Sequence, residues 1–135
     1  MTVAELQRQI DAVPFHEFLK IEAVSVDSAA GEVVLRMPFR HAFRRSSAKA
    51  QLHGGVTSAF IDIAGDYALA AILGRGVPTV NLRIDFLRMV ENSDLTARAQ
   101  VIKNGRNLGL VDIDVEDGEG KLIAVGRGCY STRPG

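Results

Sequence analysis

A pair of glycines ahead of an apolar segment is the first feature of this sequence that could do chemistry. Gly54 and Gly55 follow His53 and precede the strongest helical pattern in the chain. Backbone N–H groups at a helix start lack intrahelical acceptors, and glycines let a substrate oxygen approach closely. The helix dipole there favours developing negative charge. The turn is therefore a candidate oxyanion hole, although the glycines could instead only form a tight turn against a sheet.

Asp62 is the second candidate, because a carboxylate within an otherwise apolar helix is costly unless it is used or paired. As a general base it would activate water, and as a nucleophile it would form a transient anhydride. The residues leave both roles open. Asp66, one turn further along the same face, is the competing carboxylate. Pairing of Asp62 with an arginine, or its exposure to solvent, is the structural alternative.

Other reactive residues form no catalytic or metal-binding pattern. His16 and His41 are isolated, and no residues have metal-ligand spacing, so we expect no metal and no cofactor. The absence of a Gly-x-Ser-x-Gly elbow argues against a serine hydrolase. The single cysteine, Cys129, excludes an internal disulfide, and its apolar surroundings predict a packing role.

Length and charge narrow the function classes. The chain has 135 residues, and its 16 Lys and Arg balance 16 Asp and Glu. This length predicts one domain over residues 1–135. Zero net charge predicts no binding to nucleic acid or to an anionic membrane. The N-terminus has no signal-peptide pattern and no apolar stretch is long enough to span a membrane, so we expect a cytoplasmic protein.

The elements that position these residues follow from hydrophobic periodicity. Leu6, Ile10 and Val13 predict a short N-terminal helix. Apolar residues cover well over half of the helical wheel after His53 and predict a nearly enclosed helix that ends at Gly74. The predicted strands are residues 19–26, 33–37, 79–89, 95–103, 108–115 and 122–131, with a long connection over residues 39–50. Within the third strand, Val80, Leu82, Ile84 and Phe86 are predicted to share one face. This order predicts an α+β fold in which one antiparallel sheet packs around one helix.

The chain resembles the hotdog-fold thioesterases of the phenylacetate-degradation (PaaI-like) group over roughly residues 15–132. The most specific match is Leu52-His53-Gly54-Gly55-Val56-Thr57 leading into Phe60-Ile61-Asp62. In that family a His-Gly-Gly turn opens the central helix, and the catalytic carboxylate lies nine residues after the His, where this chain has Asp62. Residues 79–88, the Gly105-Arg106 turn and residues 120–124 also match family elements.

The resemblance implies a curved antiparallel sheet wrapped around one long central helix, and hydrolysis of an acyl-CoA thioester. It makes the Gly54 N–H the favoured oxyanion donor, with Gly55 beside it. His53 would position the turn through a ring hydrogen bond or touch substrate. Thr79 matches a position that often carries Ser or Thr near the nucleophile, so it could bind the water; an ordinary strand role is the alternative.

One position departs from the family pattern. Members usually carry an Asn six residues before the His, followed three residues later by Gly, whereas this chain has Ser47 and Ala50. The family Asn helps to orient the water or the carboxylate. Ser46 and Ser47 could partly replace it or could simply be loop residues.

The phosphates of coenzyme A need cationic or N–H partners. Arg83, Arg88 and Arg106 are the predicted substrate-binding residues, together with Lys103, and Arg106 is favoured because it lies on a turn. Each could equally be a solvated surface charge.

The resemblance also implies a homodimer, within a dimer of dimers, whose active sites lie at the subunit boundary. Unpaired strand edges of one sheet around one helix favour the same assembly. The runner-up function is a non-catalytic acyl-CoA or acyl-ligand binding protein, which the Ser47 departure favours. A hotdog hydratase is disfavoured because its His/Asp signature is missing. The sequence leaves the acyl group open among aryl-acetyl, aroyl and medium-chain fatty acyl groups.

Overall fold

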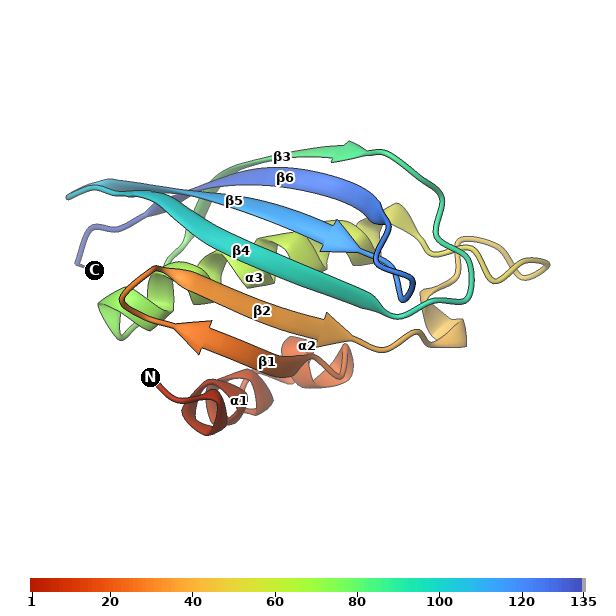
Figure 1. The fold of residues 1–135 in the computed structure, drawn as a ribbon, viewed down its shortest axis with the longest axis horizontal. Helices are drawn as coiled ribbons and strands as arrows, with labels where there is room; N and C mark the ends of the chain where they lie inside the picture. Colours follow the sequence, from red (N-terminus) through yellow and green to blue (C-terminus); the bar gives the residue numbers. More distant parts are fainter. Residues whose placement is uncertain (135) are drawn as a thin grey trace.

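The computed structural model describes residues 1–134 as a six-stranded sheet curved around one long helix (Figure 1). Its helices are α1 (Val3–Asp11), α2 (Pro14–Phe18), the single 3-10 turn η1 (His41–Phe43) and α3 (Gly54–Leu73). Its strands are β1 (Glu22–Asp27), β2 (Glu32–Met37), β3 (Thr79–Phe86), β4 (Leu95–Asn104), β5 (Leu108–Glu116) and β6 (Leu122–Ser131).

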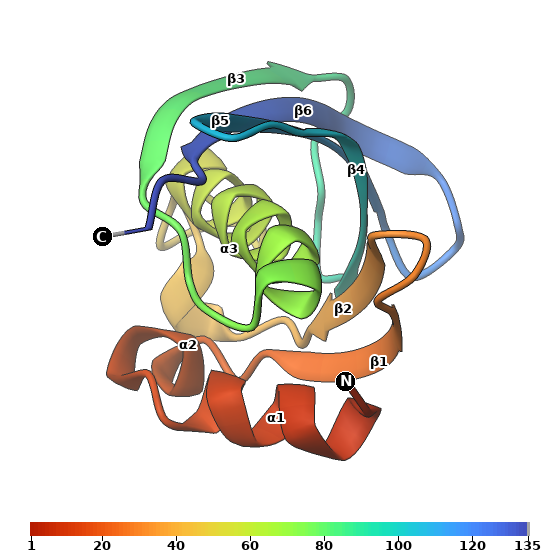
Figure 2. The same cartoon turned by 90° about the vertical axis from the view of Figure 1, so that its left-hand side faces the viewer.

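The strands lie in the order β1-β2-β4-β5-β6-β3, and every neighbouring pair is antiparallel. Short turns join β1 to β2, β4 to β5 and β5 to β6 as antiparallel hairpins. At the last of these, the Asp117 carboxylate accepts backbone N–H groups from Glu119 and Lys121. Seen along α3, the sheet encloses the helix from β2 round to β3 (Figure 2). The predicted α+β class and the hotdog arrangement are confirmed.

α3 forms the centre of the core because its apolar residues surround most of its circumference. Phe60, Ile61, Ala64, Ala68 and Leu69 are fully buried against the sheet. Gly74 ends the helix in the left-handed conformation, with φ of 75°, which an L side chain rarely adopts. By length and composition α3 could cross a membrane, but here it is the helix around which the sheet packs.

The N-terminal segment differs from the sequence prediction beyond residue 11. α1 begins at a capping box of Thr2 and Glu5 and buries Leu6 and Ile10. Val13 does not continue it; it is exposed and precedes α2, because Pro14 starts a new helix. α1 lies along β1 and covers that edge of the sheet, and α2 packs against α1 (Figure 2).

β3 is the other edge strand and pairs only with β6 among residues 1–134. Leu82 and Ile84 pack on the core as predicted. Val80 and Phe86 are 60% and 55% exposed, so the predicted apolar face is buried only at its middle. Val80 lies at an irregularity in the pairing with β6, and Phe86 reaches the N-terminal end of α3. This edge therefore combines unpaired backbone with exposed apolar side chains.

Candidate active site at the N-terminus and polar stripe of the central helix

His53 caps the start of α3 and decides which glycine N–H stays open. Its Nδ1 accepts the Gly55 N–H at 2.8 Å. A Cβ on Gly55 would lie 2.9 Å from that nitrogen, so the cap requires glycine there. Within residues 1–134 the Gly54 N–H has no acceptor. Of the two predicted donors, Gly55 is thus committed to the cap and Gly54 is free for a ligand.

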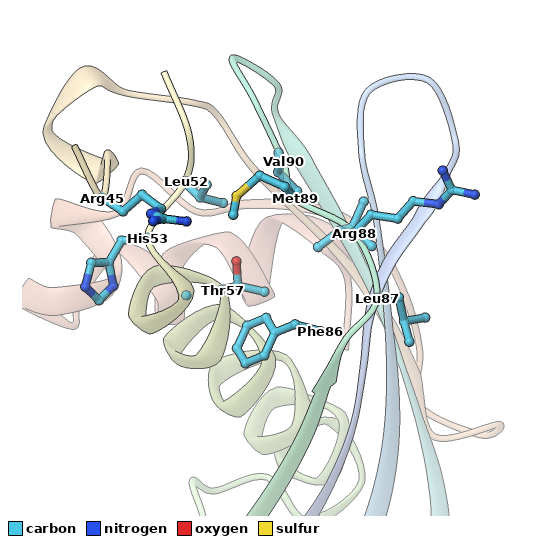
Figure 3. Close-up of a pocket in the computed structure, with 11 residues that line it drawn as sticks. Arg45, Leu52, His53, Thr57, Phe86, Leu87, Arg88, Met89 and Val90 are labelled. Atoms are coloured by element: carbon cyan, nitrogen blue, oxygen red, sulfur yellow. The ribbon is translucent and has the colours of Figure 1, made fainter. Parts of the chain in front are cut away.

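A pocket of about 480 Å³ opens beside Gly54 (Figure 3). The Phe86 ring stands against the helix start, 3.5 Å from where a Cβ on Gly54 would lie. Thr57, one turn into α3, is almost fully buried at the pocket wall. The remaining lining residues are Arg45, Leu52, His53, Leu87, Arg88, Met89, Val90 and Ile123. A pocket lined largely by apolar residues beside the Gly54 N–H suits a thioester carbonyl whose oxygen accepts that N–H.

The structure brings two predicted site residues into direct contact. The Thr79 hydroxyl, at the first residue of β3, donates to Asp62 Oδ1 at 2.7 Å. Asp62 lies partly buried on α3 with Ser58 and Asp66, and we call these three residues the polar stripe. The Ser58 hydroxyl is turned back onto the Gly54 carbonyl oxygen, at 2.8 Å. Asp62 therefore keeps lone pairs for a water or a carbonyl carbon while Thr79 orients it.

Asp66 has a structural partner. Its Oδ1 accepts the Val77 N–H at 2.9 Å and so fixes the connection between α3 and β3. Burial raises the pKa of Asp66 to about 6, the Val77 hydrogen bond opposes this rise, and the neighbouring Asp62 carboxylate adds to it. Asp66 thus positions the start of β3, including Thr79.

Gly54 and Asp62 are separated along α3. Eight residues at 1.5 Å per residue place them about 12 Å apart, and Asp62 does not line the Gly54 pocket. One thioester carbon cannot be within reach of both groups of the same chain.

The remaining predicted residues are dispersed. Ser47 is exposed on the loop before α3 and has no contact with Asp62; its carbonyl accepts a long hydrogen bond from Arg44. Arg83 is exposed and pairs with Asp85 at 3.4 Å. Arg88 and Arg106 lie near opposite ends of β5, whose nine residues span about 27 Å. One chain does not bring the three predicted arginines together.

Two residues near the site were missed by sequence reasoning. Arg45 lies in the long connection predicted over residues 39–50, to which no function was given, yet it lines the Gly54 pocket. His16 appeared isolated, yet its Nδ1 is 2.8 Å from the Tyr67 hydroxyl. Burial lowers the pKa of His16, and the nearby Asp62 carboxylate opposes this. Both contacts depend on distant segments, so no local pattern could have revealed them.

Comparison with known proteins gives consistent matches. The Thioesterase superfamily matches residues 51–124, which include Gly54 and Asp62. A curated relative from Halobacterium salinarum, provisionally named an esterase, is 32% identical over 127 residues, covering 85% of this chain and 83% of its own. A solved thioesterase from Haemophilus influenzae has a TM-score of 0.85 and 29% identity, covering 97% of this chain and 90% of its own. The E. coli PaaI protein from the phenylacetic acid degradation operon has a TM-score of 0.83 and 28% identity, and the match covers 98% of this chain and 91% of the PaaI chain.

The raised pKa of Asp66 predicts a pH-dependent effect of Asp66→Asn. Between about pH 4 and pH 6 the folded protein binds more protons at Asp66 than the unfolded chain, so its ionisation destabilises the fold. The Asn variant escapes this loss and keeps an oxygen for Val77. Urea denaturation at fixed protein concentration should show the variant gaining stability over wild type from pH 4 to pH 7, by at most about 3 kcal/mol.

Asp112→Asn is the control of opposite sign. The hydrogen bond from Arg127 lowers the pKa of Asp112, so this variant should lose stability relative to wild type as the pH rises towards about 4, and the difference should then stay nearly constant from pH 4 to pH 7. A stability difference for Asp66→Asn that does not change with pH would contradict the raised pKa of Asp66.

Proposed function

The chain belongs to the Thioesterase superfamily, and from this premise we propose that it hydrolyses an acyl-CoA thioester at a site shared between two subunits. The observation that carries the proposal is the open Gly54 N–H at the start of α3, facing an apolar pocket. The thioester carbonyl oxygen accepts this N–H, and the helix dipole stabilises the oxyanion that develops. His53 acts by holding the turn.

Asp62 supplies the other half of the reaction. As a general base it takes a proton from water, which attacks the carbonyl carbon; the tetrahedral intermediate then expels the CoA thiolate. As a nucleophile its carboxylate attacks directly, and water hydrolyses the resulting anhydride. The Thr79 hydroxyl orients the carboxylate in both routes. Arg83, Arg88 and Arg106 remain candidates for the CoA phosphates, and Arg88 is the one that lines the Gly54 pocket.

The separation of Gly54 and Asp62 supports a dimer in which one subunit provides the N–H and Asp62 of the partner subunit provides the carboxylate. The β3 edge is the open edge of the sheet, and Thr79 at its start contacts Asp62. Pairing of two β3 edges in a closed dimer would make the sheets continuous, cover Val80 and Phe86, and bring a second subunit to this side. Two such dimers would form the proposed dimer of dimers.

A non-catalytic acyl-CoA binding protein is the second candidate, and the exposed Ser47 in place of the family Asn favours it. A thiol-release screen over aryl-acetyl, aroyl and medium-chain acyl-CoA esters, with binding measured in parallel, distinguishes the two functions. Thiol release supports the enzyme, whereas binding without release supports the second candidate.

Asp62→Asn should keep the fold and substrate binding while lowering kcat by roughly 10²–10⁴-fold, because the base or nucleophile is lost. Asp66→Asn, on the same stripe, is the matched control and should keep kcat near wild type. A wild-type kcat in Asp62→Asn would mean that Asp62 is structural.

Ser47→Asn should keep or raise kcat, because it restores the residue that the family uses to orient the water or carboxylate. Ser46→Asn on the same loop controls for nonspecific loop effects. A large fall in kcat for Ser47→Asn alone would show that the serine itself is needed or that the loop alignment is shifted.

The shared site predicts complementation between two inactive variants. Gly54→Pro removes the N–H and puts a ring carbon in its place, and the helix start should survive because proline is tolerated at the first position of a helix and His53 already has extended backbone angles. This variant should lose roughly 10²–10³-fold in kcat, whereas Gly54→Ala keeps the N–H and should lose less.

Mixing Gly54→Pro and Asp62→Asn subunits after unfolding and refolding should restore about a quarter of wild-type activity, since half of random dimers are mixed and each holds one intact site. No recovery in mixed dimers, or full activity in a sedimenting monomer, would overturn the shared site.

A further inference from the structure

The pocket at Gly54 contains an arginine whose guanidinium has no partner within residues 1–134. Arg45 lines this pocket, and none of the lining residues in the described chain is Asp or Glu. Its guanidinium makes no hydrogen bond or ion pair within residues 1–134. Figure 3 shows Arg45 reaching over the start of α3, on the same side as His53 and Thr57. A cation beside an N–H without an acceptor, in a pocket lined largely by apolar residues, favours an anionic ligand group.

The backbone at Arg45 is fixed by hydrogen bonds, even though its side chain has no partner within residues 1–134. Arg44 and Leu52 form an isolated antiparallel β-bridge. Next to it, the Arg45 N–H donates to the Gln51 carbonyl oxygen at 2.8 Å. These hydrogen bonds hold the connection over residues 39–50 against the segment that leads into His53. The Arg45 backbone therefore has a defined position relative to Gly54.

The neighbouring arginines have structural partners, which sets Arg45 apart. The Arg44 guanidinium donates to the His41 and Ser47 carbonyl oxygens. Arg40 donates to the Phe18 carbonyl oxygen and stacks over the Phe18 and Phe43 rings. These contacts hold the loop and α2 in place. The Arg45 guanidinium makes no such contact within residues 1–134.

We propose that Arg45 determines substrate specificity by binding an oxyanion of the thioester, a carboxylate or a phosphate, while the thioester carbonyl lies on the Gly54 N–H. This inference rests on the proposed function. A planar guanidinium binds either oxyanion through two parallel N–H donors. An acyl group that ends in a carboxylate would thus be held at both ends, by Arg45 and by Gly54.

The size of the pocket favours the carboxylate over the phosphate. A volume of about 480 Å³ corresponds to a sphere about 10 Å across. A carboxylate a few carbons from the thioester carbonyl fits within that length. The phosphates of CoA are separated from the sulfur by the whole pantetheine arm, which extends beyond the pocket. Arg88 is better placed for them, because its side chain points away from His53 (Figure 3) and its charge acts on Asp117 of the β5–β6 turn.

The test compares four thioesters: glutaryl and valeryl groups, each on CoA and on N-acetylcysteamine, which has no phosphate. Arg45→Met removes the charge and keeps an unbranched side chain close in length to the aliphatic stem of arginine, and Arg45→Lys keeps the charge. Arg44→Met is the matched control on the same loop. Loss of a charge-assisted hydrogen bond predicts a fall in kcat/KM of about 10- to 100-fold.

For Arg45→Met this fall should appear with glutaryl on both carriers, mainly through KM, while valeryl is unaffected. Arg45→Lys should recover part of the loss, and Arg44→Met should not discriminate between glutaryl and valeryl. A fall with both CoA esters and neither N-acetylcysteamine ester would also support an oxyanion site at Arg45, with phosphate as its ligand. An equal fall with all four substrates, or no fall, would overturn the proposal.

Binding of non-hydrolysable thioether analogues of glutaryl-CoA and valeryl-CoA provides a readout that does not need turnover. Arg45→Met should weaken the glutaryl analogue selectively, again by about 10- to 100-fold in Kd. If wild type releases no thiol from any ester but shows this selectivity, the proposed hydrolysis fails and the Arg45 site stands. If hydrolysis proceeds and Arg45→Met binds both analogues as wild type does, the Arg45 site fails alone.

Discussion

The close packing of α3 against β6 fixes the rotation of the central helix, and the arrangement of the site depends on this rotation. Gly65 on α3 and Gly128 on β6 both lie against the buried Tyr130 side chain, and a Cβ on either would overlap it. The Tyr130 hydroxyl donates to the Asp62 carbonyl oxygen at 3.0 Å. Because these contacts hold one face of α3 on the sheet, the polar stripe is left on the side where β3 begins.

On that side, carboxylates of α3 contact residues at the start of β3, the edge strand of the sheet. Asp66 accepts the Val77 N–H and Asp62 accepts the Thr79 hydroxyl, so both carboxylates tie α3 to the entry of β3. The open N–H of Gly54 lies about two turns away, in a pocket whose wall includes Phe86 at the other end of β3. Both halves of the proposed reaction therefore border β3, whose outer edge has no partner strand within residues 1–134 and is the edge that the proposed dimer closes.

Much of this arrangement could be predicted from local patterns. The apolar surface of α3, the glycine at its end and the alternation along the strands depend on neighbours in sequence, so they predicted the order of elements and the enclosed helix. The exposure of Val80 and Phe86 could not be predicted, because it depends on which strand lies at the edge and how far α3 extends beneath it. Nor could the pairing of His16 with Tyr67, which joins α2 to α3.

The sequence by itself determined the helix, its glycine start and the acidic residues on one stripe, because each follows from residue types at fixed spacing along one element. Only the tertiary structure decided that Phe86 stands beside the Gly54 N–H, that Asp66 holds Val77, and that Arg45 lines the same pocket. The reason is physical: hydrogen-bond partners and burial are set by where distant segments meet, and spacing along one element carries no information about that meeting.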